Sequence, residues 1–305
     1  MKKVFLLLLT FCSVLTINAQ YTDIINSKRP GFSESPYSIG TDVFQFETGL
    51  FYRDSDDDAY LAKTKSVGGE LFFRYGKFFE RLEMNAKIAY QNDDVNNLFG
   101  DKINNYGISE LTIGAKYLIY QQEYTDKSKE IRSWKRRMAF DKKRLIPSVG
   151  IYAGLNTDFL GEDYKDDGMS YKAAILLQND FSERLVLLTN LIADKISSDN
   201  EFYSHIITMT YAINEQWSFF IENQGNYRDT ASPEFHFGTG AAYLYSKNLQ
   251  FDASVRTNLF DDYTFVYGAL GVAWRLDKHS DEIINKSSPR GQMMKKKRKK
   301  KFLFF

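Results

Sequence analysis

Residues 43–53 read VFQFETGLFYR, and this stretch decides the fold. Its even-numbered positions hold mostly apolar side chains, whereas its odd-numbered positions include Gln45, Glu47 and Arg53. Successive side chains of a β-strand point to opposite faces. The alternation therefore predicts a strand with one apolar and one polar face.

The same alternation returns along the chain and predicts twelve strands in all. Each is roughly nine to thirteen residues long, near the length that a tilted strand needs to cross a bilayer. No helical period competes with them. The further segments are residues 66–75, 82–90, 108–120, 145–157, 170–179, 185–194, 202–213, 217–228, 235–245, 249–258 and 264–276.

The pattern predicts an all-β fold, a closed antiparallel transmembrane β-barrel of about twelve strands. Such a barrel is too wide for an apolar inner face to fill, and the charged, glycine-rich face could not form a dry core, so the apolar face is assigned to lipid. A soluble lipocalin-like barrel has the same period and is the alternative. Long loops are expected at residues 54–64, 91–106, 158–168 and 195–201, with an anomalous basic insertion at 121–143.

The composition excludes two classes of protein. Lys and Arg number 40 against 39 Asp and Glu, so no global field attracts nucleic acid. Mean hydropathy is −0.41 and only one long apolar run occurs, which excludes a multi-helix membrane protein.

The N-terminus carries the features of an export signal. Lys2 and Lys3 precede an apolar run that ends at Ala19, as in a secretory signal peptide; a single anchoring helix is the alternative. The one cysteine, Cys12, lies in this run, so the mature chain has no disulfide or thiolate metal site. The predicted divisions are a signal peptide at 1–19, a lead-in or plug at 20–42, the barrel at 43–276 and a basic periplasmic tail, expected to be disordered, at 277–305.

Residues 21–40 lack the alternation. One hypothesis places them in the lumen as a plug, with Arg29 and Glu34 pairing to luminal charges; the alternative is a loose periplasmic lead-in. The polar face supplies either a polar path for solutes or ion pairs that fill the barrel. The lumen-lining candidates are Glu47, Glu70, Arg74, Glu83, Lys87, Glu110, Lys116, Glu222, Arg228, Asp252 and Arg256.

Several partners are expected from the sequence. Outer-membrane lipid would surround the barrel, and acidic loops such as 54–58 could reach lipopolysaccharide through divalent cations, if they are not simply solvated. Residues 271–276 (GVAWRL) resemble the terminal signal for the barrel-assembly machinery. The basic insertion and the lysine-rich run at 295–301 are candidates for contact with a periplasmic partner, and export argues against nucleic acid.

Catalytic and cofactor motifs are missing from the sequence. Ser204 and His205 are adjacent on a predicted strand, so they point to opposite faces; His236 has no evident nucleophile nearby, and His279 is in the tail. No phosphate loop, dinucleotide fingerprint or zinc spacing occurs. We therefore expect no enzyme, no cofactor and no metal site, with an outer-membrane hydrolase as a remote alternative.

Short motifs resemble one protein family. Residues 26–36 (NSKRPGFSESP), 107–117 (GISELTIGAKY) and 246–252 (SKNLQFD) are similar to the outer-membrane barrels named for the MetA pathway of phenol degradation, often labelled transporters. The resemblance spans residues 26–276 and implies a barrel with a transport-like role and no catalytic residue. The basic insertion and the tail depart from the family pattern.

The leading functional prediction is passive transport of small solutes, apolar or aromatic ones among them, across a bacterial outer membrane. The second is a structural or interaction barrel that binds a periplasmic partner through the insertion and the tail.

Overall fold

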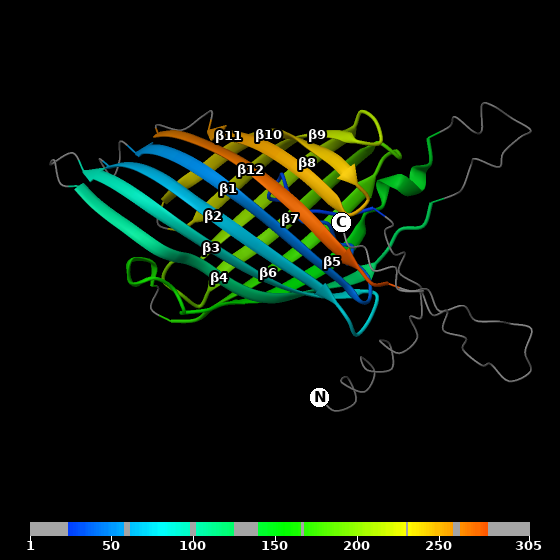
Figure 1. The fold of residues 1–305 in the computed structure, drawn as a ribbon, viewed down its shortest axis with the longest axis horizontal. Helices are drawn as coiled ribbons and strands as arrows, with labels where there is room; N and C mark the ends of the chain where they lie inside the picture. Colours follow the sequence, from blue (N-terminus) through cyan, green and yellow to red (C-terminus); the bar gives the residue numbers. More distant parts are fainter. Residues whose placement is uncertain are drawn as a thin grey trace, which may run out of the picture.

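The chain forms a closed barrel of twelve antiparallel strands, which confirms the predicted fold (Figure 1). The computed structural model describes residues 24–57, 62–97, 102–124, 140–165, 168–229, 231–258 and 263–279. Within these ranges, no helix is long and apolar enough to cross a membrane. The elements are β1 (Val43–Asp57), β2 (Ala62–Gly76), β3 (Leu82–Asn97), β4 (Lys102–Tyr120), η1 (Lys142–Leu145), β5 (Ser148–Asn156), η2 (Glu162–Tyr164), β6 (Ser170–Asp180), β7 (Leu185–Ile196), β8 (Phe202–Ala212), β9 (Trp217–Arg228), β10 (Ala231–Ser246), β11 (Leu249–Asn258) and β12 (Tyr263–Asp277).

The barrel closes where β1 pairs with β12. Their register runs from Val43 opposite Asp277 to Asp57 opposite Tyr263. We call the Val43 end the terminal end and the Asp57 end the distal end. Closure leaves no sheet edge, so every strand has a partner for its backbone groups in a medium that offers no water.

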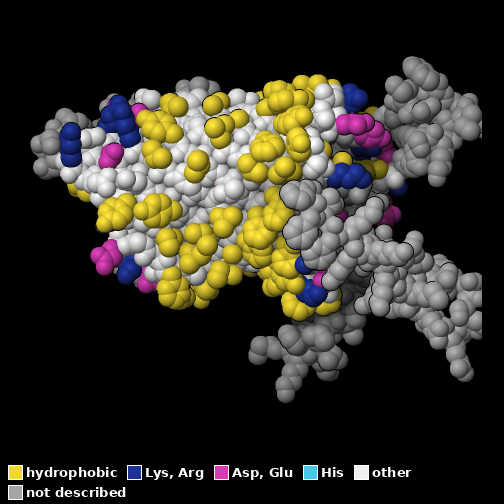
Figure 2. All heavy atoms as spheres, viewed as in Figure 1, with side chains coloured by type: hydrophobic (Ala, Val, Ile, Leu, Met, Phe, Trp, Pro, Cys, Tyr) yellow, Lys and Arg dark blue, Asp and Glu magenta, His cyan; other side chains and the backbone are white. Residues whose placement is uncertain are grey.

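In contrast to a soluble protein, the apolar face of the sheet points outward and the polar face points inward. Leu50 and Leu270 point outward and are 73% and 68% exposed, whereas Glu47 and Arg74 point inward and are 1% exposed. Hydrophobic side chains spread over the side wall, and charged ones gather at the two ends (Figure 2). The structure thus confirms the predicted orientation of the apolar face.

The predicted loops at residues 54–64 and 91–106 are wrong. β1–β2 and β3–β4 continue as paired strands through most of both ranges, so these strands project beyond the others at the distal end (Figure 1). Beyond the apolar band both faces are polar, so the alternation disappears while the backbone pairing persists. Asp56 and Lys63 form an ion pair across the first hairpin, with Oδ2 and Nζ 3.1 Å apart.

In the described ranges, two short 3₁₀ helices lie outside the sheet. Because η1 precedes β5, the strand predicted at residues 145–157 starts instead at Ser148. The second, η2, lies within the expected loop at 158–168 and folds against β4, where the Gly161 N–H donates to the Ile108 carbonyl at 2.9 Å.

Some predicted segments lie outside the described residues. These are the signal peptide at 1–19, the centre of the basic insertion at 125–139, and the tail from residue 280 onward.

Candidate functional site

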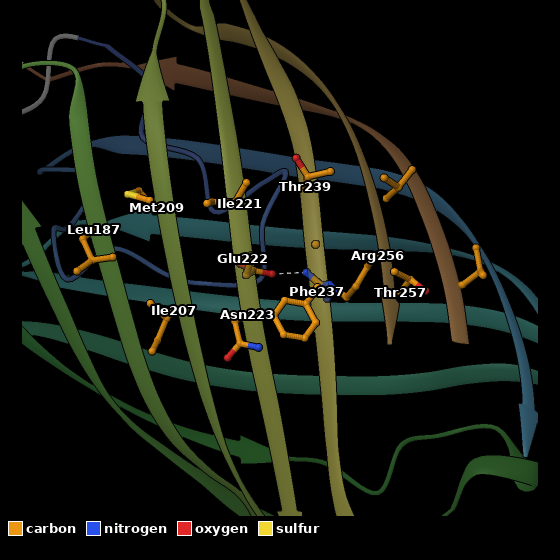
Figure 3. A pocket seen from close by; sticks show the side chains of 13 residues that line it. Leu187, Ile207, Met209, Ile221, Glu222, Asn223, Phe237, Thr239, Arg256 and Thr257 are labelled. Carbon is orange, nitrogen blue, oxygen red and sulfur yellow. Dashed lines mark hydrogen bonds and ion pairs between the residues drawn. The ribbon is translucent and has the colours of Figure 1, made fainter. Parts of the chain in front are cut away.

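The segment of residues 24–42 lies inside the barrel, and we call it the plug. Near its start, the Ile25 N–H donates to the Lys247 carbonyl at 2.9 Å, at the terminal end. Near its end, the buried Ile39 donates its N–H to Glu83 of β3 at 3.1 Å. The plug is the dark-blue coil inside the barrel in Figure 3.

One polar contact of the plug is a slot for Arg29. Glu70, Gly49, Gly271 and Asp252 are successive cross-strand partners on β2, β1, β12 and β11. The Arg29 guanidinium lies over the two glycines, where a Cβ on either would overlap it. It pairs with Glu70 on one side and with Asp252 on the other, the latter at 3.1 Å from Nη2 to Oδ1. The row of four residues therefore holds one guanidinium between two carboxylates.

Luminal carboxylates also bind the backbone of the plug. Glu47 accepts hydrogen bonds from the Ser27 hydroxyl at 2.8 Å and from the Lys28 N–H at 2.9 Å. Glu222 accepts one from the Phe32 N–H at 2.9 Å. A buried coil has backbone donors that no neighbouring strand satisfies, and these charge-assisted bonds take that role.

Glu34 is held by both its backbone and its side chain. Asn190 accepts the Glu34 N–H at 2.5 Å and donates to its carbonyl at 2.9 Å. Lys116 Nζ lies 3.0 Å from Glu34 Oε1. Burial alone would raise the pKa of Glu34, but the cations of Lys116, Lys28 and Arg74 lower that pKa to about 2. The carboxylate is therefore ionised at neutral pH.

Arg74 is the centre of a buried ion-pair network. Its Nε and Nη2 bind the two carboxylate oxygens of Glu83 at 2.7 and 2.9 Å, and its Nη1 lies 3.2 Å from Glu47. The same Nη1 donates to the carbonyl of Asn26 in the plug at 2.5 Å. Such a network stabilises little by itself, but removing one member leaves a buried charge without a partner.

Arg256 fastens the middle of the plug. Its guanidinium pairs with Glu222 (dashed in Figure 3). The guanidinium carbon also lies 3.3 Å from the ring centroid of Phe32 and 5.8 Å from that of Tyr267. These cation–π contacts connect the plug to β9, β11 and β12.

The plug separates two cavities of the lumen. The distal cavity has a volume of about 210 Å³ and the terminal cavity one of about 280 Å³. Lys28, Arg29 and Gly31 line both. The plug thus lies across the path between the two ends of the barrel.

The predicted site residues occupy different depths of the lumen. Arg29 and Glu34 are in the plug, and both are buried. Arg228 lies at the distal rim, 39% exposed at its side chain, and pairs with Glu234 at 2.8 Å. The distal cavity is lined by Glu70, Lys87 and Glu110, among others. The remaining candidates are buried inside the barrel: Glu47, Arg74, Glu83, Lys116, Glu222, Asp252 and Arg256.

Several luminal residues were not among the candidates. Lys172 and Asp194 form an ion pair at 2.5 Å, and Asn190 binds the plug. All three occupy polar-face positions of the predicted strands, so the alternation could have identified them. Lys28 and Phe72 also line the distal cavity, but the alternation does not identify them. Lys28 lies in the segment without alternation, and Phe72 is an aromatic residue on the polar face.

The histidines do not assemble a hydrolase site around Ser204. His205 points outward and its Nε2 lies 3.0 Å from Asn223 Oδ1, whereas Ser204 is buried on the inner face. His236 stacks on Phe265 with ring centroids 4.4 Å apart. Over the described residues, no group of three His, Cys, Asp or Glu side chains could hold a metal ion.

A depression of about 680 Å³ lies on the outer wall over β7–β12. Its labelled apolar side chains in Figure 3 are Leu187, Ile207, Met209, Ile221 and Phe237. These positions alternate with inward residues such as Glu222, so the depression belongs to the face assigned to lipid and is separate from the lumen.

Residues 27–276 match the protein family described as "Putative MetA-pathway of phenol degradation". The chain belongs to this family. This match confirms the family resemblance that the short motifs indicated, and the matched residues include most of the plug as well as the barrel. Among curated proteins, none matches the sequence.

Several solved structures are similar to this chain. An outer membrane channel from Pseudomonas putida F1 is similar with a TM-score of 0.59 and 11% identity, over 83% of this chain and 100% of that chain. The KdgM porin in complex with disordered oligogalacturonate has a TM-score of 0.48, 8% identity and coverages of 75% and 98%. The CymD monoaromatic hydrocarbon channel has a TM-score of 0.46, 10% identity and coverages of 87% and 95%.

Proposed function

We propose that this family member is a passive channel of the bacterial outer membrane for small solutes, apolar or aromatic ones among them. The observation that carries the proposal is a plug held by polar contacts between two luminal cavities of about 210 and 280 Å³. Water can replace hydrogen bonds and ion pairs one at a time, so such a plug can shift without unfolding the barrel. The arrangement described here is then the closed state.

The fold supports this proposal, because it is shared with an outer membrane channel from Pseudomonas putida F1. In bacterial outer-membrane barrels the short turns face the periplasm. On that basis the terminal end, with Val43 and Asp277, faces the periplasm, and the distal hairpins face outward. The barrel conducts solutes in this proposal and catalyses no reaction.

Single-channel recording tests the proposal. Full-length mature protein in planar bilayers is compared with Arg29→Ala, and Arg228→Ala serves as the control because Arg228 pairs only at the rim. We expect low conductance for the unmodified protein and for Arg228→Ala, and clearly higher conductance for Arg29→Ala. Absence of conductance in all three, and in a variant lacking residues 24–38, would favour a structural barrel.

One observation favours the second candidate function, an interaction barrel. The two segments that flank residues 125–139 are fastened to the terminal rim at Asp180. Tyr124 donates its hydroxyl to Asp180 Oδ2 at 3.1 Å, and Arg144 Nη1 donates to the Asp180 carbonyl at 2.7 Å. A periplasmic partner bound by the basic insertion would therefore be held at the mouth of the barrel. Pull-down from periplasmic extract, with and without residues 125–139, tests this candidate.

A further inference from the structure

The distal cavity is lined by a charged wall and by a smaller apolar wall. The charged wall comes from β2–β4 and the plug, and includes Lys87 and Glu110. The apolar wall is a patch on β6, β7 and β8, where Leu176, Ile192 and Ile206 lie on neighbouring strands. The ion pair of Lys172 with Asp194 lies on β6 and β7 beside this patch. Such a division suits a ligand with a charged group at one end and an apolar body at the other.

Among the described residues, the charged groups that line this cavity are paired, with one exception. The pairs are Arg29 with Glu70 and Asp252, Lys87 with Glu110, Lys172 with Asp194, Glu34 with Lys116, and Glu47 with Arg74. A paired charge in a low-dielectric site has little to gain from a ligand, because binding would have to break the existing pair.

Lys28 is the exception. Within the described part of the chain, its Nζ makes no hydrogen bond and no ion pair, and it lies 5.2 Å from the centroid of the Phe72 ring in a cation–π contact. Glu34 attracts it but is already engaged by Lys116 at 3.0 Å. Burial lowers the pKa of Lys28, and the like charges of Lys87 and Lys172 also lower it. An anion beside Nζ would relieve this cost of desolvation.

We propose that the distal cavity is a binding site for a small monocarboxylate with an apolar body. The carboxylate lies on Lys28 Nζ, and the body lies against Phe72 and the wall of Leu176, Ile192 and Ile206. The volume of about 210 Å³ fits one aromatic ring with its carboxylate, since a cavity of about 150 Å³ lined by apolar side chains binds benzene. The inference that such a carboxylate crosses the membrane rests on the proposed channel function. The inference that it binds in the distal cavity does not.

A series of ligands of similar size and different charge tests the site on the unmodified protein. Full-length mature protein in detergent micelles is titrated with benzoate, benzamide and benzylammonium in a calorimeter. We expect benzoate to bind at least about tenfold more tightly than either of the others, the ratio given by one hydrogen-bonded charge. Equal binding of benzoate and benzamide would overturn the proposal, and so would displacement of benzoate by equimolar chloride, because a bare anion site would then suffice.

Substitution of Lys28 tests which residue holds the carboxylate. The Lys28 side chain makes no polar contact with the described barrel residues, and the hydrogen bond from the Lys28 backbone N–H to Glu47 does not depend on that side chain. Lys28→Gln should therefore leave the plug in place. We expect Lys28→Gln to lose at least about tenfold in benzoate affinity, with Lys28→Arg retaining most of it. Lys63→Gln, an exposed lysine at the distal hairpin, is the matched control and should bind as the unmodified protein does.

The outcomes separate the binding site from the channel. Undiminished benzoate binding by Lys28→Gln would overturn the inference whatever the conductance. Selective, Lys28-dependent binding without any permeation of benzoate into liposomes would uphold the site and contradict the channel. If Lys28→Gln failed to fold, the ligand series on the unmodified protein would still decide.

Discussion

Gly49 and Gly271 are direct cross-strand partners at the seam of β1 and β12, and the space that their side chains would fill holds the Arg29 guanidinium. Glycine allows this close approach because it has no Cβ. Glu70 and Asp252 continue the same row on either side and supply the two carboxylates. Four neighbouring strands of the wall thus each contribute one residue to the binding site of a single plug side chain.

Gly271→Ala should displace Arg29 from its slot. A Cβ at this position overlaps the guanidinium, which can move because it is the far end of a flexible side chain, while alanine is tolerated in the strand. We expect docking of the plug to weaken by about 1–3 kcal/mol, the usual cost of overpacking. Single-channel recording should show increased conductance.

The matched control lies three positions earlier in the same strand. A Cβ at Gly268 would meet nothing within 4 Å, so Gly268→Ala should conduct as the unmodified protein does. If Gly271→Ala and Gly268→Ala conducted alike, the slot would not hold the plug.

Arg29→Met should destabilise the protein by about 3–5 kcal/mol, because Glu70 and Asp252 would be left inside the barrel without their cation. The free energy of unfolding is measured by denaturant titration of protein refolded into lipid vesicles. Combining Arg29→Met with Glu70→Gln and Asp252→Asn should recover much of the loss, since no unpaired charge then remains.

An exposed pair provides the scale for this measurement. Lys63→Ala removes the cation of a half-exposed pair with Asp56, and solvent screening should leave the free energy of unfolding nearly unchanged. A loss for Arg29→Met as small as that for Lys63→Ala would mean that the luminal pair is solvated.

The barrel itself could be predicted from sequence, because the strand period is local. The alternation in residues 43–53 separates an apolar face from a polar face within eleven neighbouring residues. The charged, glycine-rich character of the polar face then assigns the apolar face to lipid. The same argument failed at residues 54–64. Both faces of the sheet meet water there, so paired strands show no alternation of polar and apolar side chains. Strand ends outside the membrane are therefore the part of the barrel that the period cannot predict.

The contacts of the plug could be predicted only in part. Arg29 and Glu34 stand out as charges in a segment without alternation, and in the structure they pair with Glu70 and Lys116. Their partners could not be identified, because the Arg29 slot joins positions as distant as Gly49 and Gly271. Lys28 could not be identified from the sequence for another reason: the role proposed for it depends on the absence of an ion-pair partner among the described residues, which only the packed structure shows.

Acidification should loosen the plug through Glu34. Its pKa is lowered to about 2 in the docked state, against an ordinary value of 4.5. A lowered carboxyl pKa contributes stability that is complete above the ordinary value and is lost as the pH falls through the docked value. Conductance should therefore rise as the pH is lowered from about 4.5 towards 2.

Glu34→Gln isolates this contribution from that of other luminal carboxylates. It lacks the titrating group but can keep the backbone hydrogen bonds to Asn190. The difference between its pH profile and that of the unmodified protein is the part due to Glu34. Coincident profiles would show that protonation of Glu34 does not control the plug.

Leu270→Lys tests whether lipid surrounds the barrel. Leu270 is 68% exposed near the middle of β12, opposite Leu50, whereas Leu276 lies one residue before the end of the same strand and is 37% exposed. In a bilayer, lysine on the outer face costs about 2–4 kcal/mol at the midplane and about 0–1 kcal/mol near the interface. We therefore expect Leu270→Lys to lower the free energy of unfolding in vesicles by several times more than Leu276→Lys. On a water-exposed wall both substitutions would stay within about 0.5 kcal/mol of the unmodified protein, and the assignment of the outer face to lipid would be lost.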